Sequence, residues 1–143
     1  MFPNTYFYQT AVSDWIGMII TELKQCWGTM TTRKKVLIID DEVDLCLLMK
    51  TYFLRKNYEV YIAHTLADGM TRLNAITPDF LFIDYNLPDG LGWDKLPEMY
   101  HQHPEVQYHL ISAFRPTMPE ELDGAKLTIW EKPISLKSLD NFF

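Results

Sequence analysis

The sequence has few cysteines and lacks long apolar runs. Its two cysteines, Cys26 and Cys46, are too few for a disulfide framework or a cysteine-type zinc site, and their apolar neighbours predict buried free thiols. The apolar run 15–20 is shorter than the roughly 20 residues of a membrane-spanning helix, and no basic segment precedes it as in a secretory signal. We therefore expect a protein of the reducing cytoplasm with no membrane partner.

Basic residues are also scarce relative to acidic ones. The chain has 13 Lys and Arg against 19 Asp and Glu, a net charge of −6. A nucleic-acid binder needs a basic face to neutralise phosphates, so this balance argues against direct nucleic-acid binding. The 143 residues, 48% hydrophobic, are enough for one domain with a core and too few for two of ordinary size.

The first 32 residues differ in composition from the remainder and predict an N-terminal extension before a domain at 33–143. Apolar residues recur there at helical spacing, which predicts an amphipathic helix over about 14–27. An exposed apolar helix is unfavourable in water, so we expect it to pack on the following domain, its own or that of a twofold partner, which makes a homodimer possible. The alternative is that translation begins at Met30.

From residue 35 onward, strand-like and helix-like segments alternate. Short apolar runs predict strands at 36–39, 60–63, 80–83, 108–111 and 127–130. Helical spacing predicts helices over 42–56, 67–76 and 93–102, whereas prolines and a glycine leave room for only about two helical turns between residues 112 and 127. This alternation predicts an α/β fold with a mainly parallel, doubly wound sheet.

Polar residues follow four of the five predicted strands. They are Asp40, Asp41 and Glu42 after the first, Asp84 after the third, Ser112 after the fourth and Lys132 after the fifth. Ligands of open α/β sheets bind beyond the carboxyl ends of the strands, so we expect these side chains to share one site. Carboxylates gathered there would repel one another unless they share a cation.

Magnesium suits such a site because it takes hard oxygen ligands and commonly pairs carboxylates with phosphate oxygens. Lys132 can offer a positive charge to a phosphoryl oxygen, and Ser112 can offer a hydroxyl donor. Asp84 can serve as the nucleophile that forms an aspartyl phosphate. Glu42 is better placed to begin a helix than to bind the metal. The pattern thus indicates phosphoryl transfer to a carboxylate beside Mg²⁺ or Mn²⁺.

Over about residues 34–140 the sequence resembles the receiver domain of two-component response regulators, the CheY-like superfamily. The resemblance rests on an apolar strand leading into Asp40-Asp41-Glu42, on the segment 84–92 (DYNLPDGLG), on Ser112-Ala113 and on Lys132-Pro133. It implies a flavodoxin-like sheet of five parallel strands, (β/α)5, here preceded by the extra N-terminal amphipathic helix.

The resemblance also implies a role for each site residue. Asp84 would be the phosphoacceptor, and Ser112 and Lys132 would hold the phosphoryl oxygens. Asp41, Asp84 and the backbone carbonyl of Asn86 would hold the metal, with Asp40 assisting. A histidine kinase or histidine phosphotransfer protein would be the donor, and a downstream protein the target. Such a domain is a signalling switch with slow self-dephosphorylation, not an enzyme.

Three features depart from this family pattern, and all lie on the face that the family uses for output. Ile129 occupies a position that usually holds Tyr or Phe, with Trp130 beside it on the other side of the strand. The fourth helix is interrupted, and only 11 residues follow Lys132 for the fifth. These departures keep open a receiver-like scaffold that does not turn over phosphate. A phosphohydrolase with an aspartyl-phosphate intermediate is less favoured, because Asn86 stands where a general acid is needed.

Overall fold

The computed structural model describes residues 15–22 and 32–143, and the chain divides into two units, Met1–Thr32 and Arg33–Phe143. In the first unit, residues 15–22 form a helix, which agrees with the N-terminal part of the helix predicted over 14–27. The remainder of that prediction, together with Cys26, lies outside the described residues. Large apolar side chains of this short helix are exposed, namely Trp15, Ile16, Met18 and Ile20.

The second unit is built on a parallel sheet of five strands. They are β1 (Lys35–Ile39), β2 (Glu59–Ala63), β3 (Phe80–Asp84), β6 (Gln107–Ser112) and β7 (Leu127–Glu131). The order across the sheet is β2-β1-β3-β6-β7. Central strands are buried throughout their apolar runs, whereas the edge strands β2 and β7 are half-buried. The predicted doubly wound sheet is confirmed.

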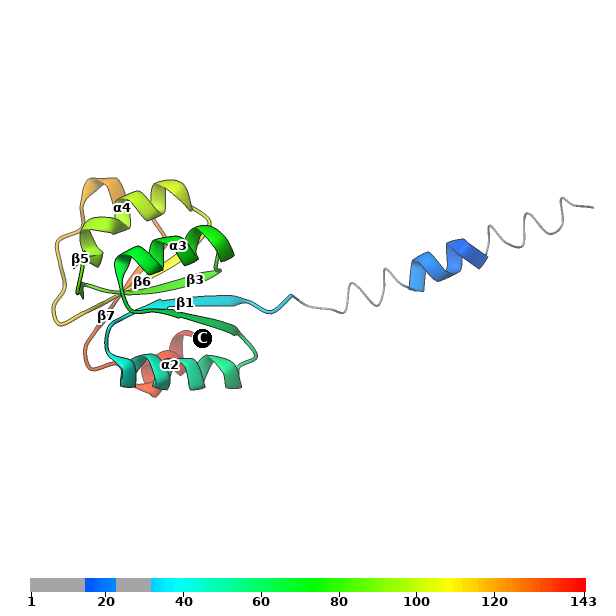
Figure 1. The fold of residues 1–143 in the computed structure, drawn as a ribbon, viewed down its shortest axis with the longest axis horizontal. Helices are drawn as coiled ribbons and strands as arrows, with labels where there is room; N and C mark the ends of the chain where they lie inside the picture. Colours follow the sequence, from blue (N-terminus) through cyan, green and yellow to red (C-terminus); the bar gives the residue numbers. More distant parts are fainter. Residues whose placement is uncertain (1–14, 23–31) are drawn as a thin grey trace, which may run out of the picture. The chain divides into compact units, whose positions relative to one another are not determined.

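Helices cover both faces of this sheet (Figure 1). They are α2 (Val43–Arg55), α3 (Leu66–Ile76), α4 (Gly92–Gln102) and α5 (Leu136–Phe142). α3 and α4 lie on one face, and α2 and α5 lie on the other. Successive side chains of a strand point to opposite faces, so Leu81 and Ile83 enter the core under α3 and α4, while Phe80 and Phe82 enter the other core.

Local sequence explains where the helices begin and end. The Thr65 hydroxyl accepts a hydrogen bond from the Asp68 amide at 3.2 Å, and the Asp89 carboxylate accepts two more from Leu66 and Ala67, which together cap the start of α3. Asn57 follows α2 with a positive φ of 65°, a conformation that ends a helix and that asparagine adopts more readily than most residues.

The segments after β3 and β6 differ from the prediction. After Asp84, where no strand was predicted, the chain forms a small antiparallel hairpin of β4 (Asn86–Leu87) and β5 (Gly90–Leu91). Where about two helical turns were predicted, a single 3-10 turn, Glu120–Leu122, is present. Pro116 and Pro119 remove backbone donors there, which explains the shortfall. The final helix, α5, has only seven residues, in keeping with the short C-terminal segment.

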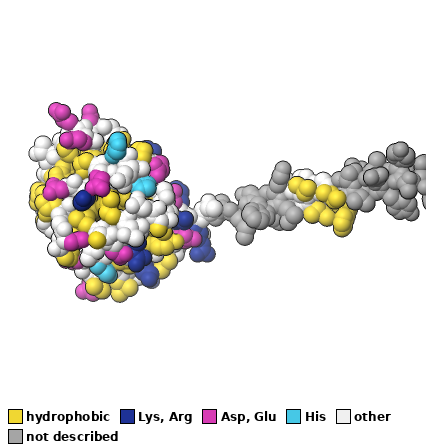
Figure 2. Space-filling model, turned by 45° about the horizontal axis from the view of Figure 1, so that its top comes forward, with side chains coloured by type: hydrophobic (Ala, Val, Ile, Leu, Met, Phe, Trp, Pro, Cys, Tyr) yellow, Lys and Arg dark blue, Asp and Glu magenta, His cyan; other side chains and the backbone are white. Residues whose placement is uncertain are grey.

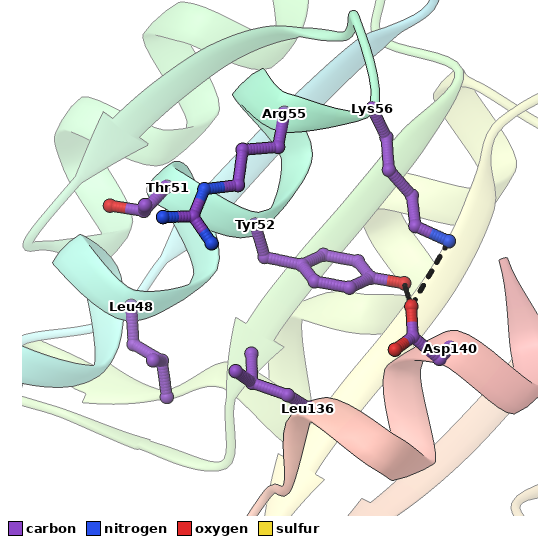
Figure 3. A pocket seen from close by; sticks show the side chains of 7 residues that line it. All are labelled: Leu48, Thr51, Tyr52, Arg55, Lys56, Leu136 and Asp140. Carbon is purple, nitrogen blue, oxygen red and sulfur yellow. Dashed lines mark hydrogen bonds and ion pairs between the residues drawn. The ribbon is translucent and has the colours of Figure 1, made fainter.

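Polar and aromatic contacts hold the short helix α5 against α2. The Asp140 carboxylate accepts a hydrogen bond from the Tyr52 hydroxyl at 3.0 Å and pairs with the Lys56 ammonium at 3.1 Å. These contacts bound a hollow between the two helices, whose opposite side is formed by Leu48 and Leu136 (Figure 3). Phe143, which follows α5, packs edge-on against Phe53 of α2. These contacts with α2 therefore hold the seven-residue helix in place, although it is too short to be stable by itself.

Candidate active site

Three carboxylates meet at the carboxyl edge of the sheet. Asp40 and Asp41 follow β1, and Asp84 ends the adjacent strand β3. The chain leaves β1 toward one side of the sheet and returns as β3 on the other, so a crevice opens between the two strand ends. One carboxylate oxygen from each acid lies within 4.8 Å of the others. The predicted convergence of these acids is therefore present in the fold.

Asp40 is fully buried, and only part of its carboxylate is satisfied. Its Oδ1 accepts a hydrogen bond from the Glu42 amide at 2.8 Å, whereas its Oδ2 is buried with no hydrogen-bond partner among the described residues. Burial raises the pKa of Asp40 to about 6, the Glu42 amide lowers it, and the charge of Asp84 raises it further. An unpartnered buried carboxylate oxygen beside two other acids fits a hard divalent cation.

Asp84 is the last residue of β3 and is 5% exposed. Its Oδ2 accepts a hydrogen bond from the Lys132 ammonium at 3.3 Å, and its Oδ1 faces the Asn86 amide at 3.4 Å. Burial raises the pKa of the Asp84 carboxyl, although the charge of Lys132 opposes this. The Asp84 carboxylate thus belongs to the acid cluster and also contacts the Lys132 ammonium.

Gly92 permits the close approach of α4 to this strand. A Cβ at residue 92 would clash with the backbone oxygen of Asp84 and lie 2.8 Å from Cγ1 of Ile83. Only a residue without a side chain therefore allows the first turn of α4 to lie against the end of β3.

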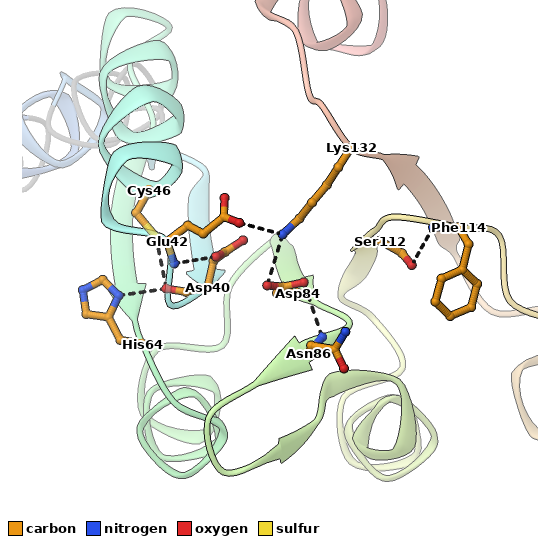
Figure 4. Close-up of polar contacts among 9 residues, drawn as sticks. All are labelled: Asp40, Glu42, Cys46, His64, Asp84, Asn86, Ser112, Phe114 and Lys132. Atoms are coloured by element: carbon orange, nitrogen blue, oxygen red, sulfur yellow. Dashed lines mark hydrogen bonds and ion pairs between the residues drawn. The ribbon is translucent and has the colours of Figure 1, made fainter.

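The Lys132 ammonium contacts two carboxylates. Its ammonium contacts Asp84 at 3.3 Å and Glu42 Oε1 at 3.2 Å (Figure 4). Burial opposes the charge of this lysine, but the attraction of Asp84 and the bond to Glu42 prevail and raise its pKa. Sequence reasoning placed Glu42 at the helix start, where it lies, but missed the contact with Lys132, which joins residues 90 positions apart.

Ser112 ends β6 in a buried position, 1% exposed, with its hydroxyl directed to its own loop. The Oγ accepts a hydrogen bond from the Phe114 amide at 3.2 Å, and Figure 4 shows the side chain turned toward Phe114. The structure thus brings Asp40, Asp41, Asp84, Asn86 and Lys132 into one cluster, with Ser112 at its border.

Two further groups near the cluster were not found from the sequence. His64, which follows β2, contacts the backbone oxygen of Asp40 through Nδ1 at 2.8 Å. Phe114 contacts the ring of Tyr85, which directly follows Asp84. The sequence does not show that an isolated histidine or aromatic residue lies near the site, because strand register decides which residues become its neighbours.

Ile129 and Trp130 occupy opposite faces of β7, as the alternation of strand side chains predicts. Ile129 packs with the core under α3 and α4, and Trp130 packs with the other core. The Trp130 indole donates a hydrogen bond to His109 Nδ1 at 2.9 Å, which holds it on that side. Trp130 is therefore no substitute for an aromatic side chain at position 129.

Comparison with known proteins places this site in a family. Residues 36–141 match the response regulator receiver domain. The response regulator PilR of Pseudomonas aeruginosa is 27% identical over 110 residues, which are 76% of this chain and 25% of PilR. The chain belongs to the response regulator receiver domain family. It spans about a quarter of the length of that curated relative.

Solved structures share the fold. A CheY-like receiver domain from Methanospirillum hungatei superposes with a TM-score of 0.67 at 22% identity, covering 78% of this chain and 90% of that one. A response regulator from Burkholderia pseudomallei, solved with a phosphorylated aspartic acid, a calcium ion and citrate, gives a TM-score of 0.62 at 20% identity. That match covers 74% of this chain and 64% of the other. The flavodoxin-like CheY fold is thereby confirmed.

Among residues 15–22 and 32–143, no helix has both the length and the apolar character needed to cross a bilayer.

Proposed function

We propose that this domain is a phosphorylation switch in which Asp84 accepts a phosphoryl group from a histidine kinase or histidine phosphotransfer protein. The observation that carries the proposal is the environment of the Asp84 carboxylate, which contacts the Lys132 ammonium and clusters with the acids Asp40 and Asp41. Phosphoryl transfer requires a positioned nucleophile and neutralised charge, and this cluster supplies a nucleophile, a cation and a metal-binding acid pair.

Asp41, Asp84 and the Asn86 backbone carbonyl would hold Mg²⁺ or Mn²⁺, with Asp40 assisting. The cation would offset charge on the phosphoryl oxygens. An Asp84 carboxylate oxygen attacks phosphorus, and the bond from phosphorus to the donor's imidazole nitrogen breaks, with its electron pair left on that nitrogen. Lys132 moves from carboxylate to phosphoryl oxygen, and Ser112 supplies a hydroxyl donor to a second oxygen.

The Burkholderia receiver that holds a phosphorylated aspartic acid supports the same chemistry on this fold. We further propose a cytoplasmic setting, a downstream protein as the target, and slow hydrolysis of the aspartyl phosphate in place of enzymatic turnover. The longer relatives carry segments beyond the receiver, so the output of the whole protein is part of this proposal.

A receiver-like scaffold without phosphate turnover is the second candidate. The observation in its favour is the reduced face around β7, where the chain forms one 3-10 turn and a seven-residue helix and where Ile129 replaces an aromatic residue. Both candidates share the fold, and they differ in whether Asp84 becomes phosphorylated.

Phosphorylation with acetyl phosphate and Mg²⁺ separates them. Intact-mass spectrometry should show one added phosphoryl group in the wild type and none in Asp84→Asn. Asp94→Asn serves as the control, because Asp94 is an exposed acid in the first turn of α4. Equal phosphorylation of wild type and Asp84→Asn would exclude Asp84, and absence of phosphorylation in every protein would favour the scaffold.

The same assay tests the metal. Excess EDTA should abolish phosphorylation, because the acids then repel the incoming phosphate. Asp41→Ala should weaken Mg²⁺ binding more than Asp40→Ala, since Asp41 is the proposed direct ligand. Full phosphorylation in EDTA would contradict the metal site.

A further inference from the structure

Three aromatic rings form a stack beside the acid cluster. The Tyr85 ring lies nearly parallel to Trp93, with centroids 6.3 Å apart and an interplanar angle of 19°. Phe114 meets Tyr85 edge-on, with centroids 4.8 Å apart at 61°. Tyr85 directly follows Asp84, Trp93 lies in the first turn of α4, and Phe114 lies two residues after Ser112. The stack therefore joins the segments that leave β3 and β6.

Phe114 is held at two points, and each adjoins a site residue. Its amide donates to the Ser112 hydroxyl at 3.2 Å, and its ring rests on Tyr85. The ring is 50% exposed, and residues 113–119 form neither helix nor strand. A loop with so little secondary structure depends on its few specific contacts, and these two act beside the exposed Arg115–Glu131 ion pair at 2.8 Å.

The two contacts compete with the proposed role of Ser112. A serine hydroxyl that accepts from the amide two residues ahead occupies one rotamer, and turning the Oγ toward a phosphoryl group on Asp84 removes it from that amide. The Phe114 amide then loses its protein acceptor, so this bond no longer fixes the loop backbone at this residue. Because the ring belongs to the same residue, a loop released here carries the ring away from Tyr85.

We propose that Phe114 is a positioning residue that acts as the aromatic switch of this receiver. In the resting domain its amide holds the Ser112 hydroxyl away from Asp84, and its ring on Tyr85 holds the loop closed. Binding of Ser112 to the phosphoryl group breaks both contacts and releases the 113–119 loop with the Phe114 ring. This inference rests on the proposed function, since it needs Ser112 to bind a phosphoryl oxygen.

The packing of β7 explains why the switch would lie here. Ile129 offers no ring and no polar tip, and Trp130 is held on the opposite face by His109. Among the described residues, Phe114 is the aromatic residue whose amide bonds to Ser112 and whose ring contacts the residue after Asp84.

Nuclear magnetic resonance on the full chain tests the movement directly. Mg²⁺ with beryllofluoride, a phosphoryl mimic, would be added to saturation. The Overhauser effect between the Phe114 and Tyr85 rings should be present in the free protein and lost in the saturated one, while the Phe114 amide resonance shifts. Retention of that ring contact at saturation would overturn the proposal.

Substitution of Phe114 supplies a second measurement. If the ring stabilises the closed loop, Phe114→Ala should raise the affinity for beryllofluoride by about two- to tenfold, the range expected for loss of one aromatic pair. Phe114→Tyr keeps a ring and should restore the wild-type affinity. Met118→Ala is the matched control, because Met118 lies in the same loop and is 46% exposed.

Unchanged affinity in Phe114→Ala, or an equal rise in Met118→Ala, would contradict the switch. These outcomes can be told apart from a failure of the proposed function itself. In that case Asp84 is not phosphorylated by acetyl phosphate, whereas failure of the switch alone leaves phosphorylation intact and the Phe114–Tyr85 contact unbroken.

Discussion

Asp40 illustrates the energetic cost of the site at the scale of one residue. Its folded-state pKa of about 6 lies above the ordinary 3.8, so the folded domain binds the proton more tightly than the unfolded chain. Stability from this group is present below pH 3.8 and is lost as pH rises to about 6. The shift corresponds to a cost of about 3 kcal/mol at neutral pH. The protein retains a carboxylate that destabilises the metal-free domain.

Replacing Asp40 with asparagine should therefore stabilise the domain without metal. We expect the free energy of unfolding of Asp40→Asn to exceed that of the wild type by about 1–2 kcal/mol in EDTA at pH 7, since the amide has no charge to bury. Urea denaturation measures the difference. Adding Mg²⁺ should reduce this difference in free energy of unfolding, because the cation offsets the charge of Asp40 in the wild type.

Asp44→Asn is the control, because Asp44 is an exposed acid in the first turn of α2. An Asp40→Asn domain no more stable than the Asp44→Asn control in EDTA would show that burial of Asp40 carries little cost.

At the scale of an element, α4 depends on its first residue. Gly92 lets the helix begin against the end of β3, so the position of Asp84 and the start of α4 are linked. The interior of α4 also contains Pro97, yet its Leu96 and Met99 are buried. Contacts with the sheet thus support a helix whose own sequence favours it only weakly.

Gly92→Ala should disturb both stability and chemistry. The added Cβ meets backbone oxygen, which cannot turn aside as a flexible side chain could, so we expect a loss of about 1–3 kcal/mol from overpacking. Phosphorylation by acetyl phosphate should slow as well, because Asp84 must shift. Thermal denaturation and the mass assay report the two effects.

Gly17→Ala is a useful comparison, since a Cβ there meets nothing within 4 Å. It should leave the domain's unfolding and phosphorylation unchanged. If Gly92→Ala behaved in the same way, the close packing of α4 on β3 would not constrain the site.

At the scale of the whole domain, two buried groups oppose each other as pH changes. His109 is stacked on Phe82 with ring centroids 4.5 Å apart, and burial lowers its pKa to about 3, against an ordinary 6.5. Below pH 6.5 the unfolded chain takes up a proton that the folded domain excludes. Stability from His109 is therefore lost as pH falls from 6.5 toward 3, while that from Asp40 is gained between 6 and 3.8.

The pH dependence should thus change when His109 is replaced. Each pH unit below 6.5 costs the wild type up to about 1.4 kcal/mol through this histidine. In His109→Gln we expect the free energy of unfolding to fall less steeply between pH 6.5 and 4.5, because glutamine does not titrate. The slope is compared rather than the absolute stability, since the ring stack is also lost.

His101→Gln provides the control, as His101 is exposed at the end of α4. Its free energy of unfolding should change with pH as steeply as that of the wild type. A His109→Gln slope equal to the wild-type slope would mean that His109 takes up its proton in the folded domain.

The whole chain also carries the N-terminal helix, and its packing partner stays a prediction. The exposed Trp15, Ile16, Met18 and Ile20 favour burial against a protein surface. Deleting residues 1–29 should lower the melting temperature or change the mass in solution measured by light scattering. A shortened protein with the same melting temperature and mass would show that the helix contributes neither to stability nor to assembly.

The acidic balance of the sequence can be followed on one face of the domain. Acidic side chains are dispersed among apolar and neutral ones on the domain face shown in Figure 2, consistent with the net charge of −6.

Strand positions and the convergence of Asp40, Asp41 and Asp84 could be predicted because buried parallel strands form continuous apolar runs whose ends share one edge. The placement of Lys132 in the same site followed from the same rule. The short segment after β6 was predicted from its prolines, although its single 3-10 turn is shorter than expected.

Contacts between side chains distant in sequence were decided only by the tertiary structure. The Glu42–Lys132 pair, the rotamer of Ser112 and the ring of Phe114 on Tyr85 depend on strand register and on which partner lies within a few ångströms. The periodicity of a sequence determines which face a residue occupies, since that is a property of the local backbone. It does not determine which of several partners a side chain meets there, because packing sets that choice.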